Sequence, residues 1–375
     1  MVPNVSTLQN PDPAVLSPAD GNVIARYKET LRRKVLLFGG LTLLLAVLVV
    51  FSIVVGSYDL SPWDVLRTLL GLEEGPRSIV VWNIRMPRIA AAIVTGWGLG
   101  LSGLATQSLL RNPLASPFTL GISQAAAFGA AFSIVALGAG GMRASALHTG
   151  DAASFFIHSV YAVTFFAFIG ALLATVAILA LARLRKMSPE TIILAGVALS
   201  SLFTSGTILV QYFATDVEIA TVVFWTFGDV ARSTWREIGL LALVTGGAVL
   251  YYLFHRWTLN AMSSGEESAR ALGVEVGRVR LTGMFIAALV AALATAFHGV
   301  IAFLGLLAPH ISRRLVGSDH RLLVHFSGLV GALLLLAADT GGRLLVGSGT
   351  LPVGVLTSFM GAPLFLYLLM KGLNR

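Results

Sequence analysis

The sequence predicts an all-α polytopic membrane protein with ten transmembrane helices and both termini in the cytoplasm. Hydrophobic residues make up 56% of the 375 positions and charged residues only 12%, whereas soluble domains are about 25% charged. Apolar runs such as 35–55 and 160–182 reach the ~20 residues that a helix needs to cross a bilayer. This composition excludes a soluble enzyme.

Ten apolar segments follow one another along the chain, at 34–56, 88–110, 118–139, 158–183, 191–213, 237–256, 281–298, 301–316, 324–346 and 353–372. The residues before the first segment include four prolines and little apolar periodicity, which is typical of disorder. We therefore expect a disordered cytoplasmic tail over 1–30 and a transmembrane domain over 31–375. The first segment is too long for the core of a cleavable signal peptide, so we expect it to remain in the membrane.

Lysine and arginine are unevenly distributed between alternate loops. With the N-terminus inside, 18 of these residues fall in cytoplasmic segments and 8 fall outside. This bias follows the positive-inside rule and requires an even number of spans. The net charge of +8 is then a consequence of topology, and it does not indicate nucleic-acid binding, which needs a basic face on a soluble fold. The chain has no cysteine, which excludes disulfides and thiolate metal sites.

Arg85 and Arg88 flank Pro87 just before the second segment, which contains Gly96 and Gly100. Proline is tolerated in the first turn of a helix, so we expect a helix to begin here with both arginines on one face at the outer surface. Two small residues four apart allow close helix approach. Snorkelling to the membrane interface and docking of an acidic external partner both explain the arginines, and both readings stay open.

The second segment ends in a polar stretch that contains Pro113 and Pro117. These prolines break any continuous helix, and Gln107, Asn112 and Ser116 are suited to bond the backbone groups that the break frees. Broken helices at membrane depth line protein or a water-filled cavity. The stretch therefore favours a transport pathway at the inner side, with an ordinary polar turn as the alternative.

The longest polar loop of the second half covers 260–280. Ser264 or Gly265 is placed to cap a short helix, and the i, i+4 spacing of Glu266 and Arg270 predicts an ion pair. Such an amphipathic helix either lies on the lipid headgroups or fits a groove on a cytoplasmic partner.

Further along, Pro309 is expected to break a helix, with Arg313 and Arg314 at the cytoplasmic side. Asp339 is an acidic residue deep in the last third, four residues before Arg343. A carboxylate inside the membrane is a functional candidate with its partner. Here an Asp339–Arg343 pair that simply neutralises both groups is the stronger expectation.

The chain contains, in this order, IRMPRIAAAIVTGWGLGLSGLATQSLLRNPLASPFTLGIS, GEESARALG, GLLAPHISRRLVGSDHR and LPVGVLTSFMGAPLFLYLLMK. Together these motifs resemble the FecCD/BtuC family of permeases, the membrane subunits of binding-protein-dependent ABC importers for iron siderophores, haem and cobalamin. The resemblance covers about residues 34–373 and leaves out the N-terminal tail.

This resemblance implies a BtuC-like type II importer permease with ten helices, placed as a multi-pass protein in the cytoplasmic membrane of a prokaryote. It also implies a homodimer or a closely related heterodimer, two ATPase subunits on the cytoplasmic face and a substrate-binding protein outside. The sequence has no G-x-x-x-x-G-K-[ST] phosphate loop. We therefore expect no catalytic residue and no cofactor or metal bound by this chain, with ATP and Mg used by the partner ATPase.

The resemblance also implies roles for individual residues. Arg85, Arg88 and Arg343 match external arginines that receive glutamates of the binding protein. The segment 265–273 matches a cytoplasmic coupling helix that rests in a cleft of the ATPase, with contact residues Gly265, Glu266, Ala269, Arg270, Leu272 and Gly273. Ser188 and Thr191 fall near the inner gate of the family and join Gln107, Asn112 and Pro113 as expected pathway or gate residues. Pro189 and Glu190 depart from the small polar residues expected there.

The expected function is import of an iron(III)-siderophore-type chelate by ATP-driven alternating access. Cobalamin, haem or molybdate are alternative cargoes on the same scaffold. An ATP-independent secondary transporter is a more distant alternative, and a passive channel would be expected to show a selectivity element that the sequence lacks.

Overall fold

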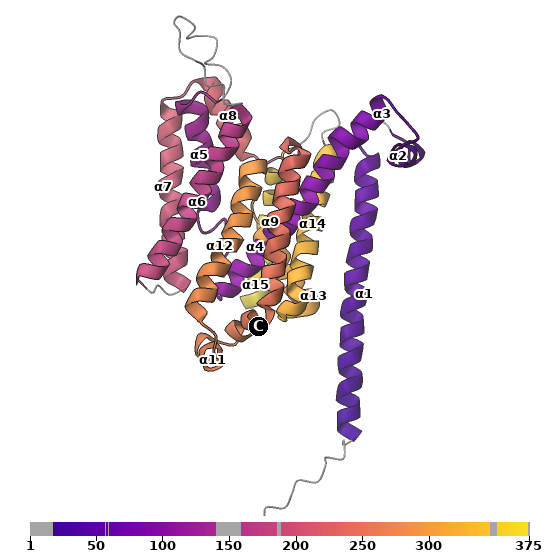
Figure 1. Ribbon diagram of the computed structural model, residues 1–375, viewed down its shortest axis with the longest axis vertical. Coiled ribbons are helices and arrows are strands. Elements are labelled where there is room, and N and C mark those ends of the chain that lie inside the picture. Colours follow the sequence, from indigo (N-terminus) through magenta and orange to yellow (C-terminus); the bar gives the residue numbers. More distant parts are fainter. Residues whose placement is uncertain are drawn as a thin grey trace, which may run out of the picture. The chain divides into compact units, whose positions relative to one another are not determined.

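The computed structural model describes residues 18–56, 58, 60–139, 159–185, 189–345 and 351–373. Within these ranges every regular element is a helix (Figure 1). The chain divides into two compact units, Met1–Leu43 and Leu44–Arg375. All contacts of the candidate functional regions lie inside the second unit.

Each of the ten predicted segments overlaps a helix. These helices are α1 (Pro18–Val54), α4 (Met86–Leu109), α5 (Ile122–Ala136), α6 (Ser159–Arg185), α7 (Pro189–Tyr212), α9 (Trp235–Phe254), α12 (Val276–His298), α13 (Leu304–Val316), α14 (His320–Leu345) and α15 (Val353–Leu373). Seven helical stretches of the described chain are long and apolar enough to cross a membrane, and α5, α13 and α15 are not among them. The chain is thus a multi-pass helical membrane protein, while the count of ten spans and the cytoplasmic termini stay predictions.

The first helix begins earlier than the sequence predicts. Residues 18–30, expected to be disordered, belong to α1. Pro18 stands at the start of this helix, the position that proline tolerates best, and the residues from Ala25 to Leu31 are mostly good helix formers. Residues 1–17 lie outside the described residues.

As predicted, α4 begins at Met86 with Pro87 in its first turn. Pro87 does not mark the first helical residue of this stretch, however, because the chain is already helical from Pro76. The short α3 (Pro76–Ile79) leads through a π-helical segment, Val80–Arg85, into α4. The N–H of Met86 bonds the carbonyl of Val81, five residues back. Pro87 has no N–H, so it cannot make the next bond of this register, to the Trp82 carbonyl. The Trp235 indole donates to that carbonyl at 3.4 Å.

Pro309 does not break a helix either, since it lies inside α13. Its ring removes the backbone bond to the carbonyl of Gly305, four residues back. That carbonyl faces Gly103 of α4 so closely that a Cβ on Gly103 would overlap it. The lost hydrogen bond therefore lies at a helix crossing, where α13 packs tightly against α4.

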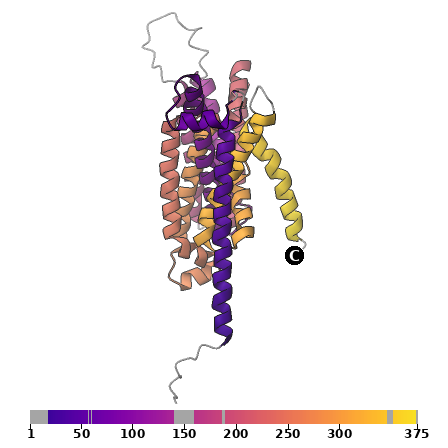
Figure 2. The same ribbon diagram turned by 90° about the vertical axis from the view of Figure 1, so that its right-hand side faces the viewer.

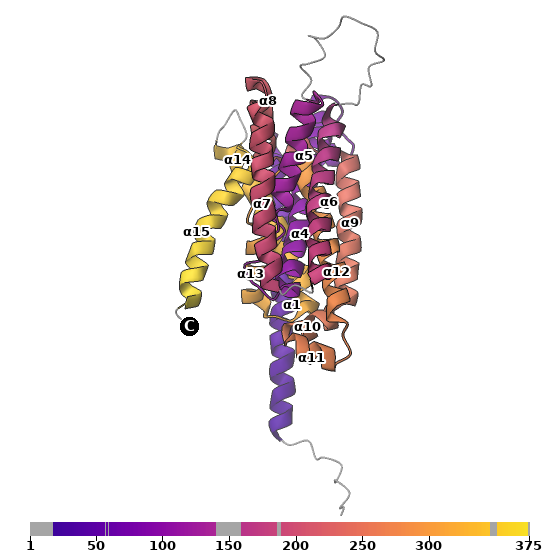
Figure 3. The same ribbon diagram turned by 90° about the vertical axis from the view of Figure 1, so that its left-hand side faces the viewer.

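Helix α4 lies at the centre of the second unit. It packs against α9, α12, α13 and α14, while α5 packs against α6 and α7 (Figures 1 and 3). By contrast α15 leans away from α14 along most of its length (Figure 2), and only 11% of the apolar window of α7 is buried. Exposed apolar helices of this kind suit contact with lipid or with a further subunit.

The close packing of α4 on α14 depends on glycine. A Cβ on Gly96 would overlap the carbonyl of Gly331, and the reverse also holds. Gly100 faces the carbonyl of Ser327 in the same way. The four-residue spacing in α4 thus does permit the close approach that the sequence predicts.

Gly331→Ala is expected to lower the free energy of unfolding by about 1–3 kcal/mol, because an added methyl group forces two packed backbones apart. Thermal unfolding in mild detergent measures the change. Gly341→Ala is the matched control, since Gly341 is in the same helix and a Cβ there meets nothing within 4 Å. Equal melting temperatures for the two variants would contradict this assignment.

Five shorter elements complete the described fold. They are α2 (Pro62–Leu69), α8 (Asp216–Thr226), the 3-10 helix η3 (Val230–Arg232), α10 (Arg256–Ser263) and α11 (Glu266–Ala271). The last two form the polar loop that the sequence analysis marked as a candidate partner surface, and they lie at the end of the bundle where α4 finishes and α12 begins (Figure 1).

Candidate functional site

The segment 265–273 folds as a short helix between two glycine turns, and we call it the coupling segment. Gly265 and Gly273 have φ angles of +128° and +81°, a range that glycine adopts without the steric cost met by other residues. Between them, Ala269 is fully buried while Leu272 is 72% exposed. The helix therefore packs against the protein with one face and presents an apolar side chain outward with the other.

Glu266 connects the coupling segment to the transmembrane helices. Its carboxylate lies 3.5 Å from the Arg270 guanidinium, which confirms the predicted pair, and it also forms an ion pair with Arg280 of α12. Arg280 in turn donates from Nε to the carbonyl of Leu109 at 3.2 Å. Because Leu109 ends α4, this chain of contacts joins α11 to both α12 and α4, a connection that the sequence analysis missed.

A second link ties α10 to the start of α14. The Nδ2 of Asn260 donates to Asp319 at 3.0 Å, and the Oδ1 of Asn260 accepts from the backbone N–H of His320 at 2.9 Å. Partial burial raises the pKa of Asp319, but hydrogen bonds from Arg321 and Asn260 outweigh this and hold the pKa well below its usual value. The carboxylate is therefore ionised at neutral pH and fixes the loop between α13 and α14.

At the opposite end of α4, Arg88 and Arg343 pair with Asp339, and Arg85 joins Arg343 at the end of α1. We call these four residues the arginine cluster. Arg88 makes the closest ion pair. Its Nη2 lies 2.8 Å from one Asp339 carboxylate oxygen, and its Nε lies 2.8 and 3.1 Å from the two oxygens. The predicted Asp339–Arg343 pair is present but longer, at 3.5 Å. The ion pair of Arg88 with Asp339, 251 residues apart in the chain, is thus shorter than the pair of Asp339 with Arg343.

The other two arginines bond the last carbonyls of α1. Arg343 donates to the carbonyls of Ser52 at 3.1 Å and Val55 at 3.0 Å. Arg85 donates to the carbonyl of Val54 at 2.8 Å and also to those of Ile53 and Tyr58. A helix leaves its final carbonyls without backbone partners, so these two side chains cap the C-terminus of α1.

This capping role is one that the sequence analysis did not foresee. The side chains of Arg88 and Arg343 are 11% and 8% exposed, and Arg85 as a residue is 5% exposed. In this conformation all three direct donors to acceptors within the chain. The structure brings together the three arginines assigned to docking, and their contact with an external partner stays a prediction.

The stretch predicted to interrupt the inner end of α4 does so between Leu109 and Ile122. The Oδ1 of Asn112 accepts from the N–H of Leu114 at 2.8 Å. Buried Gln107 accepts a hydrogen bond from Arg313 of α13. Asn112 thus bonds a backbone group at the break, as the sequence predicts, whereas the bond of Gln107 to Arg313 is to a side chain of another helix.

The predicted gate residues only partly come together. Gln107 and Pro113 line a cavity of about 460 Å³ with Arg111, Ser108, His310, Arg313, Arg314, Ser263, Ser318 and His320. Thr191 is exposed on α7 and does not line that cavity. Ser188 lies outside the described residues. A gate formed by all five residues therefore stays a prediction.

The fold and these sites define a multi-pass helical membrane protein that carries an anchored coupling segment at one end and an arginine cluster at the other. The profile of the FecCD transport family matches residues 44–371. The chain therefore belongs to this family and is a permease subunit of an ABC importer of the FecCD/BtuC type.

Similar proteins span nearly the whole chain. A Methanocaldococcus jannaschii protein, provisionally named an ABC transporter permease, is 47% identical over 93% of this chain and 98% of its own length. A Bacillus subtilis protein named an Fe(3+)-citrate import system permease is 37% identical over 88% of this chain and 93% of its own length. A solved inward-facing structure, provisionally assigned as a metal-chelate type ABC transporter, aligns with a TM-score of 0.75 at 31% identity, over 89% of this chain and 99% of that one.

Proposed function

We propose that this permease moves an iron(III)-siderophore-type metal chelate into the cytoplasm by ATP-driven alternating access. Support comes from the Bacillus subtilis relative named for Fe(3+)-citrate and from the solved structure named for a metal-chelate transporter. Relatives named for vitamin B12, hemin and molybdate make these compounds the alternative cargoes.

In this proposal two permease copies, as a homodimer, work with two ATPase subunits and an external substrate-binding protein. The permease makes and breaks no covalent bond, and ATP and Mg are used by the ATPase subunits. The observation that carries the proposal is the coupling segment. It exposes the apolar side chain of Leu272 and is connected through Glu266 and Arg280 to the end of α4. A partner that moves the segment therefore also exerts force on the transmembrane helices.

The arginine cluster is the proposed docking end for the binding protein. It contains three arginines and one carboxylate, Asp339, which pairs with Arg88 and Arg343. This excess of positive charge attracts acidic residues on a partner. Arg85 is buried and donates to carbonyls of the chain. Its proposed part in docking is therefore to add to the positive electrostatic potential and to keep the end of α1 in position. Arg88 and Arg343 keep a small exposed fraction, 11% and 8% of their side chains, and are the residues proposed to touch the partner.

Reconstitution into lipid vesicles tests the mechanism. The complete complex is expected to accumulate a radiolabelled ferric chelate when its binding protein and ATP are supplied on the correct sides. A non-hydrolysable ATP analogue should stop multiple-turnover uptake, because alternating access needs the ATPase to reset. Uptake that is unaffected by the analogue would favour the secondary transporter and defeat the proposal.

A further inference from the structure

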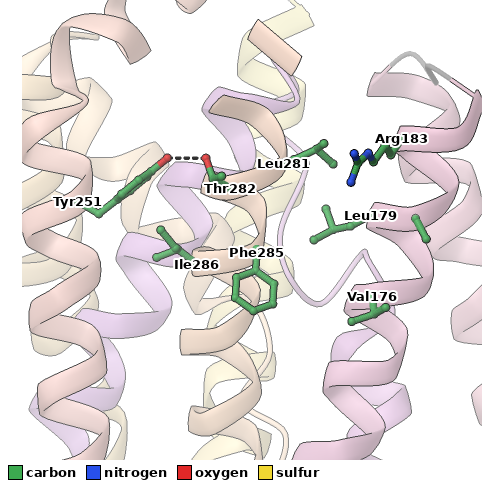
Figure 4. A pocket seen from close by; sticks show the side chains of 9 residues that line it. Val176, Leu179, Arg183, Tyr251, Leu281, Thr282, Phe285 and Ile286 are labelled. Atoms are coloured by element: carbon green, nitrogen blue, oxygen red, sulfur yellow. Dashed lines mark hydrogen bonds between the residues drawn. The ribbon is translucent and has the colours of Figure 1, made fainter. Parts of the chain in front are cut away.

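An apolar groove runs along the side of the bundle between α6 and α12. It has a volume of about 790 Å³, and its walls include Val176, Leu179, Phe285 and Ile286 (Figure 4). On the side formed by α9 and α12, the hydroxyl groups of Tyr251 and Thr282 are hydrogen-bonded to each other at 2.8 Å. The groove therefore offers an apolar surface to whatever fills it.

The groove ends at a basic hollow. This second hollow of about 680 Å³ shares Arg183 and Leu281 with the groove and is also lined by Glu266, Arg270 and Arg280. Three arginines face a single glutamate there, which leaves an excess of positive charge. Since Arg270 and Arg280 already contact Glu266, the excess is concentrated around Arg183.

Arg183 is an exposed arginine that lines both the groove and the basic hollow. Among the described residues it has no hydrogen bond or ion pair. Its guanidinium extends from α6 toward Leu281 across the mouth of the groove (Figure 4). An arginine held at the end of an apolar surface is placed to meet a molecule that is charged at one end and apolar along the rest.

We propose that the groove and the basic hollow together bind an anionic phospholipid. The phosphate headgroup sits against Arg183, with Arg270 and Arg280 supplying the surrounding positive field. One acyl chain lies along α6 from Arg183 toward Val176, a distance of about 10 Å at the helical rise per residue. The headgroup then lies beside the coupling segment, at the end of the bundle that carries the arginines of the inner loops.

Lipid fits this surface better than a protein partner for two reasons. The groove lies on the side of helices that are apolar and long enough to span a membrane, α6, α9 and α12, where lipid tails are the surrounding medium. The positive charge lies at one end of the groove, which suits a phospholipid with one charged headgroup and apolar tails. A protein segment would need an acidic residue at that end and apolar side chains along the whole groove.

Native mass spectrometry of the full-length chain, purified in mild detergent and titrated with phosphatidylglycerol or phosphatidylethanolamine, tests the proposal. Wild type is expected to retain phosphatidylglycerol preferentially. Arg183→Ala should weaken its binding about fivefold, the effect of one arginine at a membrane surface, whereas Arg183→Lys should retain it. Arg67→Ala, which removes an exposed arginine outside both hollows, is the control and should bind as wild type does.

A second variant tests the groove itself. Ala180→Phe fills the groove next to Arg183 and should reduce binding of both phospholipids, while glycerol phosphate, which has no acyl chains, should not compete with phosphatidylglycerol. Unchanged phosphatidylglycerol binding in Arg183→Ala or in Ala180→Phe would overturn the proposal. Equal competition by glycerol phosphate would overturn the role of the groove, and a change of oligomeric state in Ala180→Phe would assign the groove to a second copy of the chain instead.

Discussion

Arg88→Met is expected to lower the free energy of unfolding by about 3–5 kcal/mol, because it leaves the Asp339 carboxylate buried without its closest partner. The Asp339 side chain is fully buried and Arg88 lies 2.8 Å from it. Arg343, 3.5 Å away, compensates only in part, since its Nη1 already donates to carbonyls at the end of α1. Thermal unfolding of the purified protein in detergent measures the loss.

Two further variants make this test specific. Arg88→Met combined with Asp339→Leu removes both charges and should recover much of the lost stability, since a buried pair contributes less than the penalty for breaking it. Arg236→Met removes an exposed arginine near the start of α9 and should leave the melting temperature unchanged. If Arg88→Met unfolds like wild type yet abolishes binding of the external partner, the cluster is a docking site and the structural role assigned to Arg88 is wrong.

Glu266→Ala is expected to reduce transport by the complete complex at least tenfold while the ATPase subunits still hydrolyse ATP. The substitution removes the acceptor that holds Arg280, whose side chain is only 12% exposed. A hydrogen bond to a charged group contributes about 1.5–3 kcal/mol, which corresponds to roughly ten- to a hundredfold in a conformational equilibrium. Uptake and ATP hydrolysis measured on the same vesicles give the ratio of transport to hydrolysis.

The matched control for Glu266 is Glu275→Ala. Glu275 is in the same loop, but it pairs with Arg278 at 3.6 Å with both side chains largely exposed, and such surface pairs contribute little. A charge exchange, Glu266→Arg with Arg280→Glu, should restore part of the coupling. Equal transport by Glu266→Ala and Glu275→Ala would show that the link between the coupling segment and α12 does not transmit movement.

Local features of this protein are predictable from its sequence. The apolar segments, the helix break between Leu109 and Ile122 and the Glu266–Arg270 pair depend on residues close together in the chain. The helix α8 was missed although a signal was present. Thr215 and Glu218 form a capping box that directly precedes an apolar run, which is a recognised helix start.

Contacts between distant segments were not predictable in this way. Arg88 and Asp339 are 251 residues apart, and nothing in either local sequence indicates that their helices meet. The same holds for Arg280 and the carbonyl of Leu109, which are 171 residues apart. Spacing along one helix suggested Arg343 as the partner of Asp339, but the packing of α4 against α14 brings Arg88 closer.

Helix α4 is fastened at both of its ends. Near its start Arg88 is held by Asp339, and at its end the Leu109 carbonyl is held by Arg280, about 30 Å away at the helical rise per residue. A helix so buried behaves as a stiff rod that cannot shift at one end alone. If binding at the arginine cluster changes the position of α4, it changes the free energy of binding at the coupling segment. Thermodynamic reciprocity then requires that binding at the coupling segment change the free energy of binding at the arginine cluster by the same amount.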